Sequence, residues 1–328
     1  MTMTEEARYV FRELRAEDLP SWLETRRLCF PEDAVMDEEG FHRAHTLNPA
    51  GGRVLVGVEG DAVVSSYVAQ PMRARAFGED VYFCHVVDSM VHPDHRRGLK
   101  NPGLFVRTAE AFFDRFGDMD AVHYGWPVER ALRVGRRFLD YKLVREELAL
   151  VRELGEEADV LPEGVVELKE AGPEVLALWE RCSERWEASA VRDADYLCWR
   201  FFEHPRRRYE VLAAPAADGS LAGLCVVGLD EVHSEGARAL VDWLVPAGSD
   251  EVAGRLEAAA SARARAAGGA HLVASLPPWS ADFAAFQERG WRVQPTPYSL
   301  CARSFDRRID HDLLSRGWWL TLADGDLA

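Results

Sequence analysis

The sequence predicts an α/β (α+β) protein that is built from two successive, similar domains. Its 328 residues are too many for one typical core, and a hydrophobic content of 48% excludes a mainly disordered protein. The same order of expected strands and helices also occurs twice along the chain. We therefore expect an N-terminal domain over residues 1–155 and a C-terminal domain over residues 156–328.

The first half alternates expected strands and helices. A charged segment, residues 15–18, precedes an apolar helical pattern, and Glu59-Gly60-Asp61 has the composition of a hairpin turn between two apolar segments. In chain order, the expected elements are a strand at 9–14, a helix at 19–29, strands at 53–59, 62–75 and 80–91, a helix that ends before Gly117, a strand at 121–126, a helix at 129–138 and a final strand.

The second half repeats this order after an acidic segment and a Pro-Glu-Gly turn within residues 153–164, where we place the domain boundary. The repeat lies in the order of the elements and not in residue identity. In chain order, the expected elements are a strand at 165–168, a helix at 174–186, strands at 209–213, 221–229 and 237–245, a helix at 250–267, a strand at 271–276 and a helix at 280–289.

Charge and cysteine usage narrow the function. A net charge of −16 argues against sequence-independent binding of nucleic acid, which needs a basic surface. The six cysteines are scattered without a CxxC pair, so we expect neither a metal site nor a disulfide framework, and a reducing cytoplasm fits best. No segment approaches the ~20 apolar residues that cross a bilayer, so we expect no membrane partner.

The most informative segment joins the strand at 80–91 to the next helix. Its loop is rich in glycine and arginine, and the helix repeats Phe105, Ala109, Phe112 and Phe116 along one face. The free N–H groups of a helix start attract anions, so this loop could hold a diphosphate, with Arg96, Arg97 and Lys100 adding charge. In the alternative interpretation, the loop glycines and Pro102 only shape a turn.

Three segments resemble the GNAT superfamily of N-acetyltransferases. They are residues 91–98 (Val-His-Pro-Asp-His-Arg-Arg-Gly), the Gly103-Leu-Phe that opens the helix, and Tyr124-Gly-Trp-Pro followed by Ala131 and Leu139-Asp-Tyr141. Residues 196–205 and the tail at 318–326 resemble the degenerate partner domain of tandem acetyltransferase-like proteins. The resemblance implies two tandem GNAT-like domains, each with a mixed, mostly antiparallel central sheet flanked by helices.

The resemblance also implies a cofactor site. Acetyl-CoA, or another acyl-CoA, would act as co-substrate, its pantetheine pairing with the strand backbone and its diphosphate lying on the loop amides. A bulge in that strand would help to polarise the thioester carbonyl. The implied cofactor-binding residues are Met90, Val91, Arg96, Arg97, Gly98, Leu99, Lys100, Asn101, Gly103 and Leu104.

The sequence departs from the family pattern at two places. Residues 99–102 form an insertion between the two loop glycines, which predicts a wider loop. Val128 stands where the family often has asparagine, and Gly135 stands near the position of the usual tyrosine acid. The standard proton donor to the leaving thiolate is therefore missing from its place.

Three residues are our candidates for catalysis. Asp88, a carboxylate in an apolar strand near the expected thioester, is the first candidate for a base, although a buried acid satisfied by backbone amides is the equal alternative. Tyr124 and Tyr141 are the phenols nearest to the family's acid position, and either could instead be a packed core ring. His85 is expected to face the opposite side of the sheet from Asp88 in a structural role.

The sequence therefore predicts an acetyl-CoA-dependent N-acyltransferase that acts on a small amine by direct transfer. The N-terminal domain would hold the cofactor, and Asp242 of the second domain occupies a place analogous to Asp88. The alternative is a non-catalytic CoA- or ligand-binding protein, motivated by the missing tyrosine and by the insertion at 99–102. Transfer from a charged RNA is disfavoured by the acidic composition.

Overall fold

The structure is a computed structural model that describes residues 8–32, 36–96, 103–155, 159–232 and 234–327. It is an α/β protein with a mixed, mostly antiparallel sheet, as predicted. The chain divides into two compact units. Unit 1 contains the described parts of residues 1–73, 81–144 and 299–310, and unit 2 those of residues 74–80, 145–298 and 311–328.

Unit 1 is built on the strand order β1-β2-β3-β4-β5-β13. The outer pairs are antiparallel, whereas β4 and β5 are parallel. Its strands are β1 (Val10–Glu13), β2 (Arg53–Glu59), β3 (Ala62–Ala76), β4 (Glu79–Val91), β5 (Val122–Gly125) and the end of β13 (Arg292–Ser304). Its helices are α1 (Leu19–Cys29), α2 (Glu38–Phe41), α3 (Leu104–Phe116) and α4 (Glu129–Phe138), with the π-helical turn η3 (His42–Thr46) after α2.

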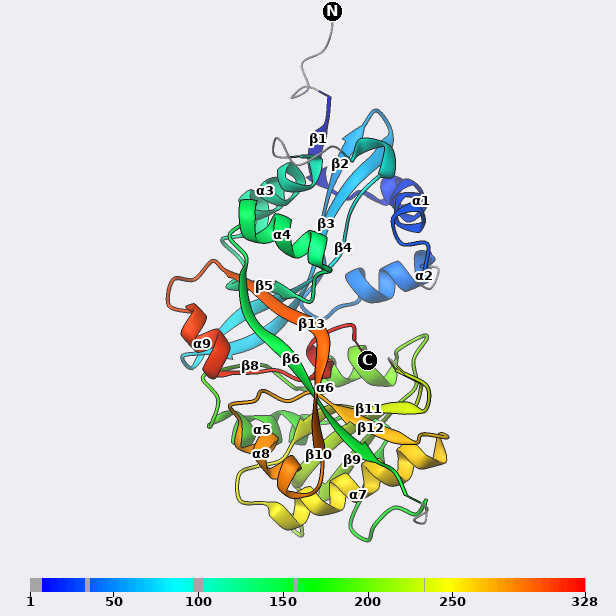
Figure 1. Ribbon diagram of the computed structural model, residues 1–328, viewed down its shortest axis with the longest axis vertical. Coiled ribbons are helices and arrows are strands. Elements are labelled where there is room, and N and C mark those ends of the chain that lie inside the picture. The colour runs from blue at the N-terminus through cyan, green and yellow to red at the C-terminus, as the bar shows by residue number, and fades with distance from the viewer. Residues whose placement is uncertain (1–7, 33–35, 97–102, 156–158, 233, 328) are drawn as a thin grey trace, which may run out of the picture. The chain divides into compact units, whose positions relative to one another are not determined.

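Helices cover both faces of the unit 1 sheet (Figure 1). Alternate residues of β2 and β3 enter different cores, as the two-residue period of a strand requires. Leu55 and Tyr67 pack with α3 residues such as Phe112, while the neighbouring Val56 and Val68 pack with Trp22 of α1. The sheet is therefore buried on both sides, with α3 and α4 on one face and α1 on the other.

Unit 2 repeats the architecture with the strand order β6-β12-β11-β10-β9-β7. Parallel pairing again occurs once in this row, between β11 and β12. The strands are the end of β6 (Lys142–Glu153), β7 (Val166–Leu168), β9 (Tyr209–Pro215), β10 (Leu221–Gly228), β11 (Ala237–Leu244) and β12 (His271–Ala274), and the helices are α5 (Pro173–Ser183), α6 (Ala194–Leu197), α7 (Asp250–Ala266), α8 (Ala281–Glu288) and α9 (His311–Arg316).

The internal repeat extends to local detail. Asp37 caps α2 by accepting a hydrogen bond from Gly40 N, and Asp193 caps α6 by accepting one from Tyr196 N, both at 2.8 Å. Each of these helices continues as a π-helical turn, η3 after α2 and η5 (Cys198–Phe202) after α6. The step from residue 37 to 193 equals the step from 53 to 209, where β2 and β9 begin.

The two halves of the sequence exchange strands. Residues 150–153 of β6 pair with β12 in unit 2, whereas residues 301–304 of β13 pair with β5 in unit 1. Each unit therefore needs a strand from the other half of the chain to complete its sheet. The predicted boundary between residues 155 and 156 adjoins residues 156–158, which lie outside the described residues, and it stays a prediction.

The C-terminal segment of unit 2 is held by buried groups. Trp319, in β14 (Trp318–Trp319), stacks on Trp186 at 4.4 Å between ring centroids. Arg192, only 1% exposed, donates hydrogen bonds to Asp242 at 2.8 Å and to Asp324 at 2.9 and 2.8 Å. This cation neutralises two buried carboxylates and ties the tail to β11.

We predict that Arg192→Met lowers the free energy of unfolding of unit 2 by about 3–5 kcal/mol, because it leaves two buried carboxylates without their cation. The matched control is Arg208→Met, which removes an exposed ion pair with Asp230 and should cost at most about 1 kcal/mol. Urea unfolding followed by tryptophan fluorescence measures both. Equal losses in the two variants would contradict the structural role of Arg192.

Candidate functional site

The candidate site forms where β4 leaves β5. The two strands are paired at Phe83, Cys84 and His85 of β4, and β4 then continues to Val91 while β5 ends at Gly125. In the described part of the chain, the last residues of β4 therefore extend beyond the segment that pairs with β5.

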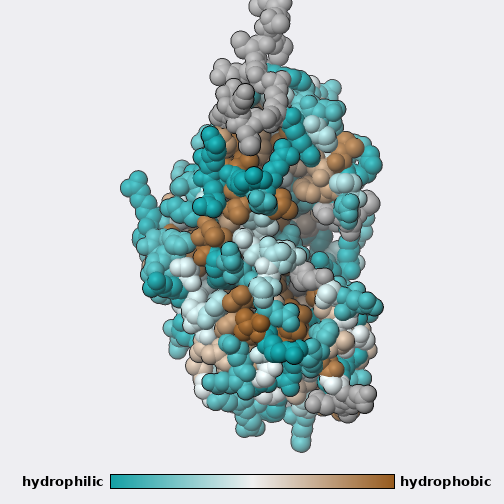
Figure 2. Space-filling view, viewed as in Figure 1, coloured by the Kyte–Doolittle hydropathy of each residue, from teal (hydrophilic) through white to brown (hydrophobic). Residues whose placement is uncertain are grey.

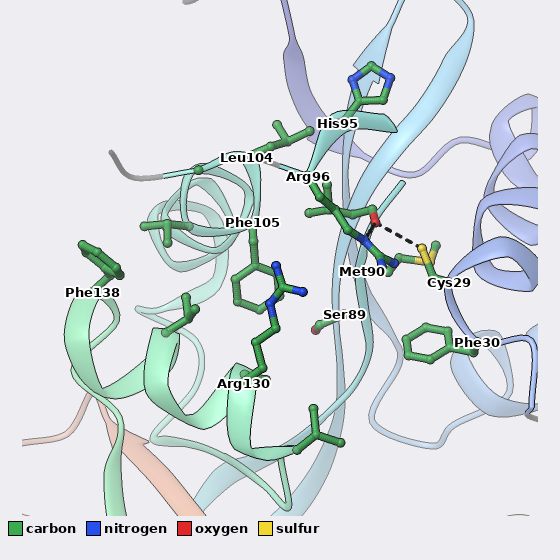
Figure 3. A pocket seen from close by; sticks show the side chains of 16 residues that line it. Cys29, Phe30, Ser89, Met90, His95, Arg96, Leu104, Phe105, Arg130 and Phe138 are labelled. Atoms are coloured by element: carbon green, nitrogen blue, oxygen red, sulfur yellow. Dashed lines mark hydrogen bonds between the residues drawn. The ribbon is translucent and has the colours of Figure 1, made fainter. Parts of the chain in front are cut away.

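A cavity of about 260 Å³ lies at this point of unit 1 (Figure 3). Most of its lining is apolar, and it is contributed by the C-terminal end of α1, the end of β4, the N-terminal turn of α3 and one face of α4. The lining residues are Cys29, Phe30, Ser89, Met90, Val91, His95, Arg96, Gly103, Leu104, Phe105, Val106, Val128, Arg130, Ala131, Val134 and Phe138.

Two arginines give the cavity positive charge. Arg96 donates from Nε to the Val91 carbonyl oxygen at 2.9 Å, and Arg130 extends from the first turn of α4 toward Phe105 (Figure 3). Among the described residues, neither guanidinium has a carboxylate within ion-pair distance. Unpaired cations beside an apolar cavity, in a protein of net charge −16, favour an anionic ligand.

The start of α3 adds further positive charge to the cavity. Gly103 is its N-cap and Leu104 its first residue, and the first N–H groups of a helix carry partial positive charge. Gly103 has an extended backbone, and a Cβ there would meet no described atom within 4 Å. A side chain at this position would thus be tolerated by the fold and would project into open space at the cavity.

The predicted cofactor-binding residues fall into two groups. The first group lines the cavity: Met90, Val91, Arg96, Gly103 and Leu104. The second group lies outside the described residues: Arg97, Gly98, Leu99, Lys100 and Asn101. The sequence did not identify Cys29 and Phe30 as lining residues, because they lie far from β4 along the chain. In the structure, Cys29 Sγ donates a hydrogen bond to the Val91 carbonyl at 3.2 Å. Sequence reasoning also missed Arg130, although this residue opens a basic run.

Asp88, the predicted base, does not line the cavity. Its carboxylate accepts a hydrogen bond from Arg26 Nε at 2.7 Å and lies 3.3 Å from His45 Nε2. Desolvation raises the pKa of Asp88, but His45 and Arg26 outweigh it, so the pKa of this carboxyl lies below its usual value. A carboxylate that already has two partners and a lowered pKa is a weak proton acceptor.

Neither predicted phenol lines the cavity. The Tyr124 ring is buried and stacks on His85, with its hydroxyl 3.9 Å from Met72 Sδ. The Tyr141 hydroxyl forms a 2.6 Å hydrogen bond with Tyr67, and burial together with Tyr67 raises the pKa of Tyr141 well above its usual value. Tyr141 therefore keeps its proton and is tied within the core.

The Tyr141 ring lies beside Gly135, the residue near the family's tyrosine position. A Cβ built on Gly135 would lie 3.4 Å from Tyr141 Cβ and 3.5 Å from its Cδ2. Both distances are ordinary van der Waals contacts, so Tyr141 packs directly against Gly135. Asp242, the analogue of Asp88, is buried in the Arg192 network of unit 2 and has its own partners there.

One buried group in unit 1 has side chains that can bind metals. Cys84, Asp120 and His123 bring their ligand atoms within 4.8 Å of one another. Asp120, however, already accepts hydrogen bonds from Arg53 at 2.7 Å and pairs with His123 at 2.8 Å. Because the Arg53 cation neutralises this carboxylate, the group is satisfied as a core network and leaves a metal little negative charge to bind.

Within the described residues, the structure contains no helix with the length and hydropathy of a membrane span.

Comparison with known proteins identifies the first domain. The family model of the acetyltransferase (GNAT) domain matches residues 10–132, so this part of the chain is a GNAT acetyltransferase domain and the predicted resemblance is confirmed. No protein with a curated description matches the sequence.

Solved structures of acyltransferases share the fold of most of the chain. A probable N-acyltransferase of Enterococcus faecalis V583 has a TM-score of 0.64 at 12% identity, covering 90% of this chain and 73% of that protein. The N-myristoyltransferase of Saccharomyces cerevisiae with bound myristoyl-CoA has a TM-score of 0.59 at 12% identity, with coverages of 92% and 83%. A GCN5-related N-acetyltransferase from Kribbella flavida has a TM-score of 0.61 at 17% identity, with coverages of 91% and 72%.

The Cys29 thiol offers a direct probe of the cavity. Burial raises the pKa of Cys29 above its usual value, although Arg96 acts in the opposite direction. Because only the thiolate is alkylated, we predict slow reaction with iodoacetamide at about pH 7.5 and a rate that still rises above about pH 9. Peptide mass spectrometry measures the rate at each cysteine.

The matched control is Cys198, a partly exposed cysteine of unit 2. A ligand that fills the cavity should slow alkylation of Cys29 and leave that of Cys198 unchanged. Rapid alkylation of Cys29 at neutral pH would contradict the raised pKa of its thiol.

Proposed function

We propose that this protein is an acyl-CoA-dependent N-acyltransferase whose unit 1 binds the acyl donor and whose acceptor is a small amine. The observation that carries the proposal is the cavity at the end of β4, with its apolar walls and its two guanidinium groups, which have no carboxylate partner among the described residues. An acyl-CoA combines the same two properties, since an apolar thioester arm is joined to a diphosphate.

The donor is proposed to lie along the cavity with its anionic end at the start of α3. The N–H groups of Leu104 and Phe105 and the guanidinium of Arg96 would face the diphosphate, and Arg130 would add charge from α4. The pantetheine arm would pass between Met90 and the apolar face of α4 formed by Ala131 and Val134. Acetyl-CoA is the proposed donor, and another acyl-CoA would use the same contacts.

The proposed reaction needs no covalent enzyme intermediate. The neutral amine attacks the thioester carbonyl carbon, a C–N bond forms, the C–S bond breaks, and its electron pair leaves with sulfur as a thiolate. The amine loses one proton and the thiolate gains one. The protein's contribution is to hold the carbonyl against polar backbone groups of Ser89–Val91 and to exclude water with its apolar lining.

The alternative function is binding without transfer. It is favoured by Gly135, which replaces the family's tyrosine acid, and by Tyr141, whose hydroxyl is occupied by Tyr67. A binding protein would keep the cavity and its cations and would lack only a route for the proton. Turnover with an amine therefore separates the two functions.

We predict that acetyl-CoA binds the wild-type protein and that Gly103→Val weakens binding more than about tenfold, or 1.4 kcal/mol, by placing a branched side chain against the diphosphate. Isothermal titration calorimetry measures both dissociation constants. Gly155→Val is the matched control, since a Cβ at Gly155 also meets nothing within 4 Å and the residue lies in unit 2. If the wild-type protein fails to bind acetyl-CoA, the proposed function is wrong.

Catalysis is tested by the release of free thiol from acetyl-CoA in the presence of a panel of small amines. Amine-dependent release that is lost in Gly103→Val supports the acyltransferase. Tight binding without release for any amine supports the alternative.

A further inference from the structure

We infer that Asp88 is a positioning residue, whose carboxylate is clamped by Arg26 and His45 and thereby fixes the turn of β4 that directs Ser89–Val91 into the cavity. The inference rests on the proposed function only for its kinetic consequences, because the clamp itself is a feature of the fold. It gives a defined role to the residue that the sequence offered as a base.

The backbone of Asp88 is exceptional for a strand. Its φ is +44°, in the left-handed region that residues other than glycine rarely adopt. The strand is paired with β5 before this residue, at Phe83–His85, and lines the cavity after it, from Ser89 onward. The left-handed residue therefore separates the part of β4 that builds the sheet from the part that builds the site.

The side chain of Asp88 is held by two elements far from it in sequence. Arg26 of α1 reaches Oδ1 at 2.7 Å, and His45 of η3 reaches Oδ2 at 3.3 Å. The side chains of the three residues are 11%, 12% and 1% exposed, in the order Asp88, Arg26 and His45. Both carboxylate oxygens are thus engaged, in a setting where water competes little.

The surroundings hold the clamp rigidly. The His45 ring packs against Phe41 at 5.0 Å and Trp22 at 6.1 Å between ring centroids. Trp22 in turn donates from Nε1 to Ser66 of β3 at 2.9 Å. These aromatic contacts restrict the movement of the His45 ring. His45 can therefore help to stabilise the unfavourable left-handed conformation of Asp88.

The clamp links the walls of the cavity. Arg26 lies one helical turn before Cys29 and Phe30, which line the cavity, and Cys29 donates to the Val91 carbonyl. Fixing Asp88 to Arg26 therefore fixes the distance between the end of α1 and the end of β4. Loss of the clamp would leave the hydrogen bond from Cys29 to the Val91 carbonyl to hold this spacing without the ion pair.

Unit 2 contains a comparable arrangement. The pairing of β10 with β11 shifts register between Val226 and Val227, so that Val226 faces Asp242 while Val227 faces Leu240. Asp242 lies at this irregularity and is bound by a buried arginine, Arg192. In each unit, an aspartate at a break in the central strand is thus fixed by an arginine.

Three variants test the inference, with Arg27→Gln as the matched control. Arg27 is the next residue of α1 and forms an exposed ion pair with Glu24. We expect Arg26→Gln to weaken acetyl-CoA binding and raise KM by between about tenfold and hundredfold, because small misplacements of a site are costly. Asparagine tolerates the left-handed region, so Asp88→Asn should weaken acetyl-CoA binding less than Arg26→Gln does. It should also leave the shape of the pH–rate profile unchanged.

The third variant is Asp88→Gly in the Arg26→Gln background. Glycine adopts a positive φ without a clamp, so it should restore part of the affinity that Arg26→Gln loses. A base would behave differently: Asp88→Asn would then lower kcat by about 10²- to 10⁴-fold at unchanged KM and abolish the acidic limb of the profile. That result would overturn the inference.

Hydrogen exchange separates this inference from the proposed function. Without any ligand, Arg26→Gln should raise the exchange rates of the Ser89–Val91 amides relative to wild type and Arg27→Gln, as followed by mass spectrometry. If the wild-type protein binds no acetyl-CoA but this increase is seen, the proposed function fails and the clamp stands. Unchanged exchange in Arg26→Gln would overturn the clamp.

Discussion

The candidate site depends on the divergence of two parallel strands, β4 and β5, after three paired residues. Parallel strands normally pair along their length. Here β4 contains one left-handed residue after the paired segment, Asp88, and its carboxylate is held by Arg26 and His45. It joins α1 and η3 to the strand and leaves an apolar cavity beside the start of α3.

Electrostatics complement this geometry. The chain is strongly acidic, and most of its arginines are consumed in ion pairs, such as Arg53 with Asp120 and Arg192 with Asp242. Arg96 and Arg130, which line the cavity, are among the arginines that pair with no carboxylate of the described residues. The surface of the protein is largely hydrophilic in the view of Figure 2. The two guanidinium groups therefore place positive charge on the cavity lining, which suits an anionic donor.

Much of the fold followed from local patterns, and the site followed only in part. The helix at 129–138 coincides with α4, and the strand at 80–91 differs from β4 by one residue, because apolar periodicity and glycine turns are local signals. β13 was missed, since Pro295 and Pro297 argue against a strand. The glycine-rich loop correctly indicated the position of the cavity. The roles of Arg26, His45 and Cys29 could not be predicted, because only tertiary packing brings them to Asp88 and Val91, more than forty positions away in the sequence.

The central claim is that the end of β4, opened by the clamp, receives the thioester arm of an acyl-CoA. The most direct measurement is a crystal structure of the protein with CoA bound. The account predicts that the pantetheine arm lies against Ser89–Val91 and α4, the diphosphate at the start of α3, and Asp88 still paired with Arg26. A CoA molecule bound elsewhere, or a β4 that pairs with β5 up to Val91, would contradict it.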